Sequence, residues 1–266
     1  MASLPDEAKA LKKLYPANQV LTAKGTTSIA TKRHWIMKNV AGKFLFMMDD
    51  DLAFFERCPA KWRVWEEHRK AYAVAPDAPA GTSLMMRRYP KDKVLLKLFQ
   101  EMDSYAGKEH DLGMIGIAHR RHSDKKKAAW EKNARMMYAF GVNRELYLKE
   151  KIRFDAIGLR EDFHVVLSML RKGHECHNYV ELLNNEYGTF GAAGGCSGER
   201  SMEYSDAQCF ELAKLHPGFV KVVDRAYTTT AVRKEVVVAW KKAYLSSLAQ
   251  PKVPSVRKAA KKAVTA

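Results

Sequence analysis

The stretch "KFLFMMDDDLAFFER", residues 43–57, places three consecutive aspartates directly after an apolar run. The run at 43–48 follows Gly42 and predicts a strand buried on both faces, as in a mostly parallel sheet. Carboxylates side by side repel one another and are costly next to a buried strand unless a positive group meets them. A metal ion, a basic partner or a solvated loop would each explain the triplet.

Side chains alternate along an extended segment, so Asp49 and Asp51 are expected on one side and Asp50 on the other. Two carboxylates aimed together offer the hard oxygen ligands that Mg²⁺ or Mn²⁺ prefers, with positions left for phosphate oxygens. The alternative is a solvated acidic turn, or an aspartate that caps the next element. A metal-dependent nuclease would also need such acids.

The segments around the triplet alternate between helix and strand patterns. Upstream, residues 5–15 read as a helix, 18–23 as a short strand, and 29–40 as a helix capped by Thr27 or Ser28. This order argues for an α/β fold. The downstream predictions are a buried strand in 110–120, a charged loop running into a helix over 123–137, a helix over 160–173, a glycine-rich loop at 189–200 and a last helix over 234–249.

Bulk composition excludes several classes of protein. The chain has 266 residues, 47% of them hydrophobic, so it is no disordered protein. It lacks an apolar run of the roughly 20 residues that span a bilayer, and its N-terminus lacks a secretory signal. Four scattered cysteines predict reduced thiols and a cytoplasmic protein, in the host cytoplasm if it is phage-encoded.

The net charge of +16 points to a polyanionic partner. Nucleic acid is the first candidate and an anionic membrane surface is the second, while a merely basic soluble enzyme is the third interpretation.

Two segments predict phosphate binding. Lys24 and Gly25 precede a capped helix start, and Arg33 follows one turn in, so the segment could cradle an anion; an ordinary capped helix is the alternative. In the glycine-rich loop, Gly194 and Gly195 allow close backbone approach. Arg200 follows them and can bind phosphate through two parallel hydrogen bonds; a flexible surface loop is the alternative.

Three acids and one histidine could serve in catalysis or metal binding. Glu161 and Asp162 start a helix, where either could be a base or could simply match the helix dipole. Asp155 is a competing base. His216 is a candidate third metal ligand, although a lone histidine is more often structural.

Taken together, these motifs resemble a known enzyme class. The order "G-x-x-S-x-A-x-x-R", apolar strand, "DDD" and helical "ED" is similar to the family-2 glycosyltransferase pattern. Seven ordered blocks between about residues 20 and 225 more closely resemble the TET/JBP-associated glycosyltransferases, phage and protist enzymes thought to glycosylate hydroxymethylated pyrimidines in DNA. The blocks are "KGTTSIATKRHWI", "KFLFMMDDDLAFFER", "NARMM", "RFD", "REDFHVVLSMLRKG", "GGCSGER" and "LHPGFVK".

The resemblance implies a GT-A-like, Rossmann-type fold with a mixed, mostly parallel sheet flanked by helices. Such folds open with a strand, a helix and a strand, and this chain is expected to lack them. Residues 1–250 are expected to form one domain and 251–266 a mobile basic tail.

The resemblance also implies residue roles. Asp162 first, and Glu161 second, would be the base that deprotonates the acceptor hydroxyl. Asp49 and Asp51, with His216, would hold Mn²⁺ or Mg²⁺, and Asp50 would contact the donor sugar or ribose. A nucleotide-sugar donor such as UDP-glucose would meet the remaining residues of the donor site, which are Lys24, Gly25, Arg33, Gly194, Gly195 and Arg200.

The segment around residue 120 is more basic than a small-molecule acceptor site requires. Its cations fit phosphate contacts on DNA, and Trp130 could stack on a displaced base; a solvated loop is the alternative. The expected nucleic-acid contacts are Arg120, Arg121, Lys125, Lys126, Lys127, Trp130 and Arg135.

The leading hypothesis is therefore an enzyme, a nucleotide-sugar-dependent hexosyltransferase that modifies hydroxymethylcytosine or hydroxymethyluracil in DNA. One alternative is a family-2-like glycosyltransferase acting on a glycan or small molecule. Another is a non-catalytic DNA-binding derivative of the fold.

Overall fold

The computed structural model describes residues 2–3, 21–49, 52–88, 92–108, 112–120, 123–186, 201–226 and 232–249. Several predicted features lie outside these residues: the helix at 5–15, the glycine-rich loop, the tail at 251–266, and the site residues Asp50, Asp51, Arg121, Gly194, Gly195 and Arg200.

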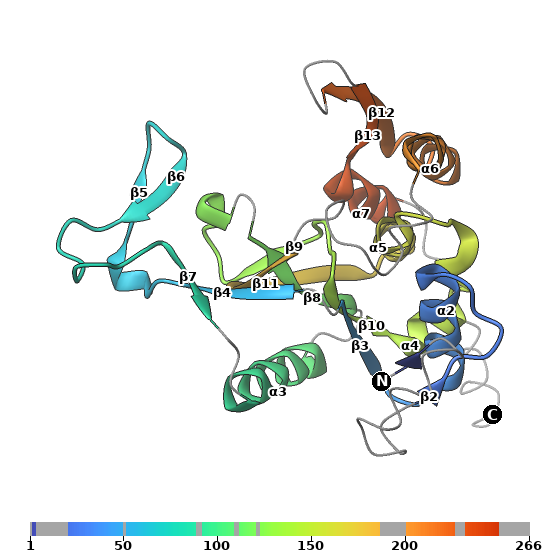
Figure 1. The fold of residues 1–266 in the computed structure, drawn as a ribbon, viewed down its shortest axis with the longest axis horizontal. Coiled ribbons are helices and arrows are strands. Elements are labelled where there is room, and N and C mark those ends of the chain that lie inside the picture. The colour runs from blue at the N-terminus through green and yellow to red at the C-terminus, as the bar shows by residue number, and fades with distance from the viewer. Residues whose placement is uncertain are drawn as a thin grey trace, which may run out of the picture.

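A seven-stranded mixed sheet forms the centre of the molecule (Figure 1). Its order is β3 (Phe44–Met48), β10 (Ala139–Asn143), β8 (Leu112–His119), β11 (Glu175–Glu186), β4 (Leu52–Arg57) and β7 (Met85–Arg88), and β9 (Trp130–Lys132) also pairs with β11. The α/β class is confirmed.

The direction of the strands differs from the prediction. Among the described strands of this sheet, only the β8–β11 ladder is parallel, so the sheet is mostly antiparallel and not mostly parallel. The apolar run in β3 correctly indicates that both faces are covered, since Leu45 and Met47 lie in one core cluster and Phe44 and Phe46 pack against another. Burial of both faces does not fix the direction of the neighbouring strand.

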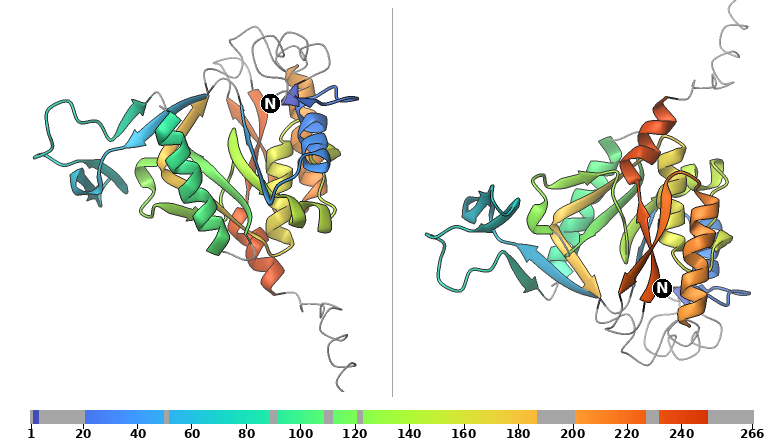
Figure 2. Two further views of the ribbon diagram at one scale, coloured as in Figure 1. Left: turned by 90° about the horizontal axis from the view of Figure 1, so that it is seen from below. Right: turned by 90° about the horizontal axis from the view of Figure 1, so that it is seen from above.

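Helices cover both faces of the sheet (Figure 2). On one side, α3 (Asp92–Lys108) packs Leu98, Met102 and Ala106 against the sheet. On the other side lie α2 (Ile29–Asn39), α4 (Arg144–Lys149), α5 (Glu161–Arg171) and α7 (Trp240–Leu248). The larger core lies on this second side, and α5 supplies five of its fully buried side chains, Val165, Val166, Leu167, Met169 and Leu170.

Two small β hairpins extend this architecture. The pair β5 (Arg63–Glu66) and β6 (Ala71–Val74), entered through η2 (Ala60–Trp62), projects away from the sheet (Figure 1). The pair β12 (Val220–Ala226) and β13 (Val232–Val238) packs against α6 (Met202–Leu215). Near the N-terminus, β1 (Ala2–Ser3) and β2 (Leu21–Thr22) form a short parallel pair.

The local predictions have mixed outcomes. The helices α2, with Ser28 as its N-cap, and α5 are confirmed. The helix predicted within 123–137 is wrong, because the segment forms the short turn η3 (Ser123–Lys125) and then β9. Residues 234–238 belong to β13 because consecutive valines favour strand, and the last helix starts only at Trp240. Within the described residues, no helix has the length and apolar character needed to span a membrane.

Candidate active site

A buried arginine joins the end of β3 to the start of α5. Arg33 lies one turn into α2, and only 5% of its surface is exposed. Its Nη2 donates to Asp49 Oδ1 at 2.6 Å and its Nη1 to Glu161 Oε1 at 2.5 Å. The guanidinium carbon lies 5.0 Å from the centre of the Phe140 ring. The structure thus brings together Arg33, Asp49 and the acidic pair that the sequence singles out separately.

The acids keep Arg33 charged. Burial alone would lower the pKa of Arg33, but the nearby Glu161, Asp49 and Asp162 more than offset this effect, so the pKa is raised. Arg33 therefore acts as a permanent internal counter-ion for these acids.

Asp162 has the properties of a general base near neutral pH. Its Oδ1 accepts a hydrogen bond from the Phe163 backbone N–H at 2.8 Å. Burial and the adjacent Glu161 raise the pKa of Asp162 to about 7, although Arg33 and Arg135 oppose the rise. A base works best when its pKa lies near the working pH, so Asp162 is suited to accepting a proton there.

The turn before α5 is held in an unusual conformation. Arg160, the N-cap residue, has a φ of 64°, in the left-handed region that costs a non-glycine residue roughly 1–2 kcal/mol. Helix α6 holds this turn: Arg160 Nη1 donates to Ser205 O at 3.1 Å, and the Gly158 and Leu159 N–H groups donate to Gln208 Oε1 at 2.9 and 3.3 Å. These contacts fix where α5 starts, and hence where Glu161 and Asp162 lie.

Arg135 lies beside the acids. Its guanidinium carbon lies 4.5 Å from the centre of the Phe163 ring, and its charge acts on Asp162. The sequence analysis predicts that Arg135 contacts nucleic acid. It does not predict that the side chain lies next to the candidate base. The "NARMM" block is the signal that could have assigned it to the site.

The loop before α2 is the segment predicted to bind the nucleotide-sugar donor. Lys24 and Gly25 are exposed, and Gly25 has a φ of 72° that suits glycine. Ser28 and Thr31 form a capping box, with Thr31 N donating to Ser28 Oγ at 3.2 Å and Ser28 N to Thr31 Oγ1 at 3.0 Å. These hydrogen bonds occupy the backbone N–H groups of Ser28 and Thr31, which an anion bound here would need. The role of the loop in binding the nucleotide sugar stays a prediction.

His216 contacts partners other than the carboxylates. Its Nε2 lies 2.9 Å from His164 Nδ1, and Arg171 Nη1 donates to its Nδ1 at 3.1 Å. Both ring nitrogens therefore have protein partners. The role of His216 as a metal ligand stays a prediction.

Asp155, the competing base, is held in an ion pair. Arg153 donates to both of its carboxylate oxygens, at 2.9 and 2.8 Å, and these hydrogen bonds lower the pKa of Asp155. A carboxylate held in this way is a weaker base than Asp162.

A divalent cation is compatible with the chemistry of Asp49. Its side chain is 31% exposed at the end of β3, and its carboxylate oxygens are the ligands that hard cations prefer. Within the part of the chain that the structure describes, no three acids, histidines or cysteines converge as metal ligands would. Asp50 and Asp51 lie outside that part.

The predicted nucleic-acid contacts lie mostly on one basic surface. A cavity of about 610 Å³ is lined by Trp130 and by five lysines, Lys125, Lys126, Lys127, Lys132 and Lys241. One face of the Trp130 ring is covered by Tyr105, which stacks on it at 3.9 Å. Arg120 is exposed and lies over the Phe55 ring, with its guanidinium carbon 4.3 Å from the ring centre.

This surface continues onto the projecting hairpin. Lys127 Nζ lies 4.0 Å from the centre of the Trp65 ring on β5. At the tip of the hairpin, exposed Arg69 and Lys70 each pair with a nearby glutamate. The sequence prediction missed the hairpin because it predicts no element between residues 58 and 109.

Comparison with known proteins gives one match. A family model described as TET-Associated Glycosyltransferase matches residues 4–195, a span that includes Arg33, Asp49, Arg135, Glu161 and Asp162. Neither a curated protein nor a solved structure matches the chain.

Proposed function

The chain belongs to the TET-associated glycosyltransferase family, and on this basis we propose that it moves a sugar from a nucleotide-sugar donor to the hydroxyl group of a hydroxymethylated pyrimidine in DNA. The observation that carries the proposal is the cluster at the end of β3. There Arg33 holds Asp49 and Glu161 together, beside an Asp162 with a pKa of about 7.

In the proposed reaction, Asp162 accepts the proton of the acceptor hydroxyl while the hydroxyl oxygen forms a bond to the anomeric carbon of the sugar. The bond between that carbon and the donor diphosphate breaks, and the diphosphate leaves with the electron pair. Arg33 and Arg135 place two fixed positive charges close to this step. Their charge opposes the rise in the pKa of Asp162 and keeps the base available near neutral pH.

Asp49, with Asp51, is proposed to hold Mn²⁺ or Mg²⁺. When bound, this ion would supply positive charge for the departing diphosphate without a proton transfer. Asp50, Arg200 and the loop at Lys24 and Gly25 keep the donor-site roles that the resemblance implies, whereas both ring nitrogens of His216 already have protein partners.

DNA is proposed as the acceptor because of the charge distribution. The net charge is +16, and lysines 125–127 lie on a surface that reaches the projecting hairpin. Cations in such an array bind backbone phosphates without reading sequence. A hydroxymethylated base would then need to leave the stack to reach Asp162.

The test combines the full chain and Mn²⁺ with a panel of nucleotide sugars and matched duplexes. The duplexes contain hydroxymethylcytosine, hydroxymethyluracil or only unmodified bases. Digestion to nucleosides and mass spectrometry should detect one sugar added to a hydroxymethylated nucleoside and none in the unmodified duplex. Asp162→Asn should reduce the product by about 10²–10⁴, and the control Asp103→Asn, at an exposed position on α3, should keep it.

Two outcomes would contradict the proposal. Transfer to a free glycan with no modified DNA would favour a family-2-like activity. Tight DNA binding with neither transfer nor metal-dependent donor hydrolysis would favour a non-catalytic DNA-binding protein.

A further inference from the structure

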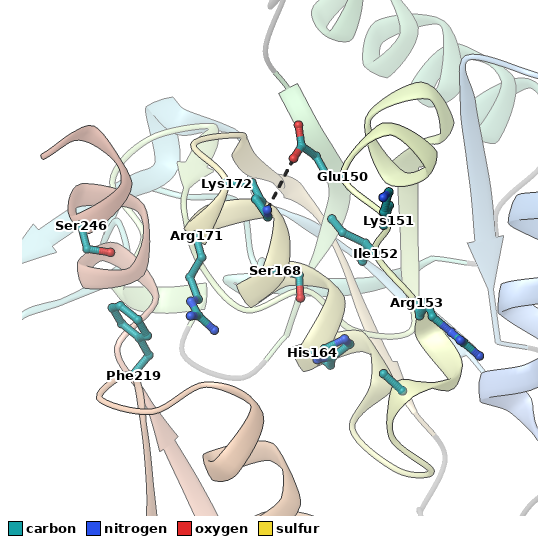
Figure 3. A pocket seen from close by; sticks show the side chains of 11 residues that line it. Glu150, Lys151, Ile152, Arg153, His164, Ser168, Arg171, Lys172, Phe219 and Ser246 are labelled. Carbon is teal, nitrogen blue, oxygen red and sulfur yellow. Dashed lines mark ion pairs between the residues drawn. The ribbon is translucent and has the colours of Figure 1, made fainter. Parts of the chain in front are cut away.

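A second cavity lies along α5, separate from the acid cluster (Figure 3). It has a volume of about 460 Å³, and its walls come from α5, α7, the segment after α4 and the turn at Phe219. Arg33, Asp49, Glu161 and Asp162 are not among its lining residues. Any ligand in this cavity would therefore occupy a different place from the donor and the acceptor.

Positive charge dominates the lining. The cavity presents four cations, Lys151, Arg153, Arg171 and Lys172, and one carboxylate, Glu150. Arg153 pairs with Asp155, and Lys172 Nζ lies 3.8 Å from Glu150 Oε2. Among the described residues, Lys151 has no carboxylate within ion-pair distance. The excess of cations favours an anion over any other ligand.

A chain of three side chains adds a fixed donor to the wall. Arg171 Nη1 donates to Leu215 O at 3.0 Å and to His216 Nδ1 at 3.1 Å, because a guanidinium only donates. Because His216 Nδ1 accepts this bond, it carries no proton, and the His216 ring is neutral.

The hydrogen bonds of the two rings fix both tautomers. Since Nδ1 of His216 accepts, its proton is on Nε2, which donates to His164 Nδ1 at 2.9 Å. His164 must then carry its own proton on Nε2, the second nitrogen of a ring that lines the cavity. The cavity wall therefore includes a histidine N–H donor whose tautomer is fixed, together with the Ser168 hydroxyl.

We propose that this cavity binds the phosphate group of a small phosphorylated molecule, such as a sugar phosphate or a nucleotide. Arginine and lysine donors match phosphate oxygens, while Ile152, Ala156 and Phe219 form an apolar wall for the rest of the ligand. The volume lies within the range of ligand pockets, and a concave site of this size suits a small ester better than the convex backbone of duplex DNA.

The experiment is isothermal titration calorimetry on the full chain in EDTA, which keeps any divalent metal away from the proposed donor site. The probes are inorganic phosphate, ribose 5-phosphate and a short unmodified duplex. The variant Lys151→Gln/Lys172→Gln removes two cavity charges, and Lys38→Gln/Lys214→Gln removes two exposed charges elsewhere. Ribose 5-phosphate should bind the parent, and the cavity variant should bind it at least about tenfold more weakly, as expected for a missing hydrogen bond to a charged group. The control should bind like the parent.

Ser168→Leu tests the site without changing charge. It should block ribose 5-phosphate, and an unchanged thermal midpoint would show that the variant folds. The proposal is overturned if the parent binds neither small probe, if the cavity variants bind like the parent, or if the control weakens binding equally. Duplex binding that falls in the cavity variant and not in the control would assign the cavity to the DNA backbone and overturn the small-molecule site. None of these readouts depends on sugar transfer, so failure here is distinct from failure of the proposed function.

Discussion

Arg33 and Glu161 lie 128 residues apart in the sequence and form an ion pair of 2.5 Å that is buried at both ends. The same guanidinium holds Asp49. This pair connects the helix before the acidic triplet to the helix that carries the candidate base. One buried cation thus links the two acidic segments of the site.

Arg33→Met should destabilise the protein by about 3–5 kcal/mol, because it leaves two carboxylates without their buried partner. Urea denaturation at neutral pH measures this loss. Arg69→Met removes a pair with Glu66 that is largely exposed, and should cost less than about 1 kcal/mol. Equal losses in the two variants would contradict a buried pair.

Asp162→Asn should lower the rate of sugar transfer by about 10²–10⁴, since it removes the proposed general base. In the parent, the rate should rise with pH through about 7, because Asp162 must lose its proton to act. Initial rates across this range measure the effect. Asp155→Asn should keep the same midpoint of the pH profile, and a shifted midpoint would transfer the role of base to Asp155.

Asp162→Asn should also change how stability depends on pH. The folded pKa of about 7 lies above the ordinary value of 3.8, so the folded state holds the proton more tightly than the unfolded chain. Stability should therefore fall as pH rises between these values. Above pH 7 the variant, which cannot ionise, should have a higher thermal midpoint, by about 2–4 °C for each kcal/mol.

Near pH 4 the difference in thermal midpoint between parent and variant should disappear. A variant that is less stable than the parent above pH 7 would show that the ionised carboxylate stabilises the fold, contrary to the direction of its pKa.

Lys125→Gln/Lys126→Gln/Lys127→Gln should weaken binding to duplex DNA about equally for all sequences. The slope of log affinity against log salt should become less steep by about 0.9 for each DNA phosphate that the variant no longer neutralises. Fluorescence anisotropy at several salt concentrations measures both. The control Lys38→Gln/Lys149→Gln/Lys214→Gln carries the same change in charge, and an equal weakening there would show that only net charge matters.

The sequence predicts the elements better than their arrangement. Ser28 correctly predicts the start of α2, and Gly173 correctly predicts the end of α5. Both are local signals, since capping and helix termination depend on residues close in the chain. The direction of the strands depends on contacts between distant residues, such as Gly141 opposite Phe46 in the antiparallel β3–β10 ladder. Apolar patterns carry no information on that direction.

The sequence predicts the site as separate residues and not as a set of contacts. The acids are recognisable because carboxylates after a strand or at a helix start are unusual. The role of Arg33 as their shared partner cannot be recognised from the sequence, because an arginine in an apolar helical stripe fits a snorkelling side chain equally well. The basic neighbours of Arg135 in the sequence point to DNA, whereas its side chain packs on Phe163.

The hairpin β5–β6 leaves and rejoins the sheet at one place. Arg57 ends β4 and Met85 begins β7, and these two residues face each other in the ladder. The segment from 58 to 84 is therefore an insertion between two paired strands. Its length and sequence can change while β4 and β7 keep their pairing register. Such an insertion lets the hairpin acquire different binding surfaces while the candidate site at β3 and α5 stays unchanged.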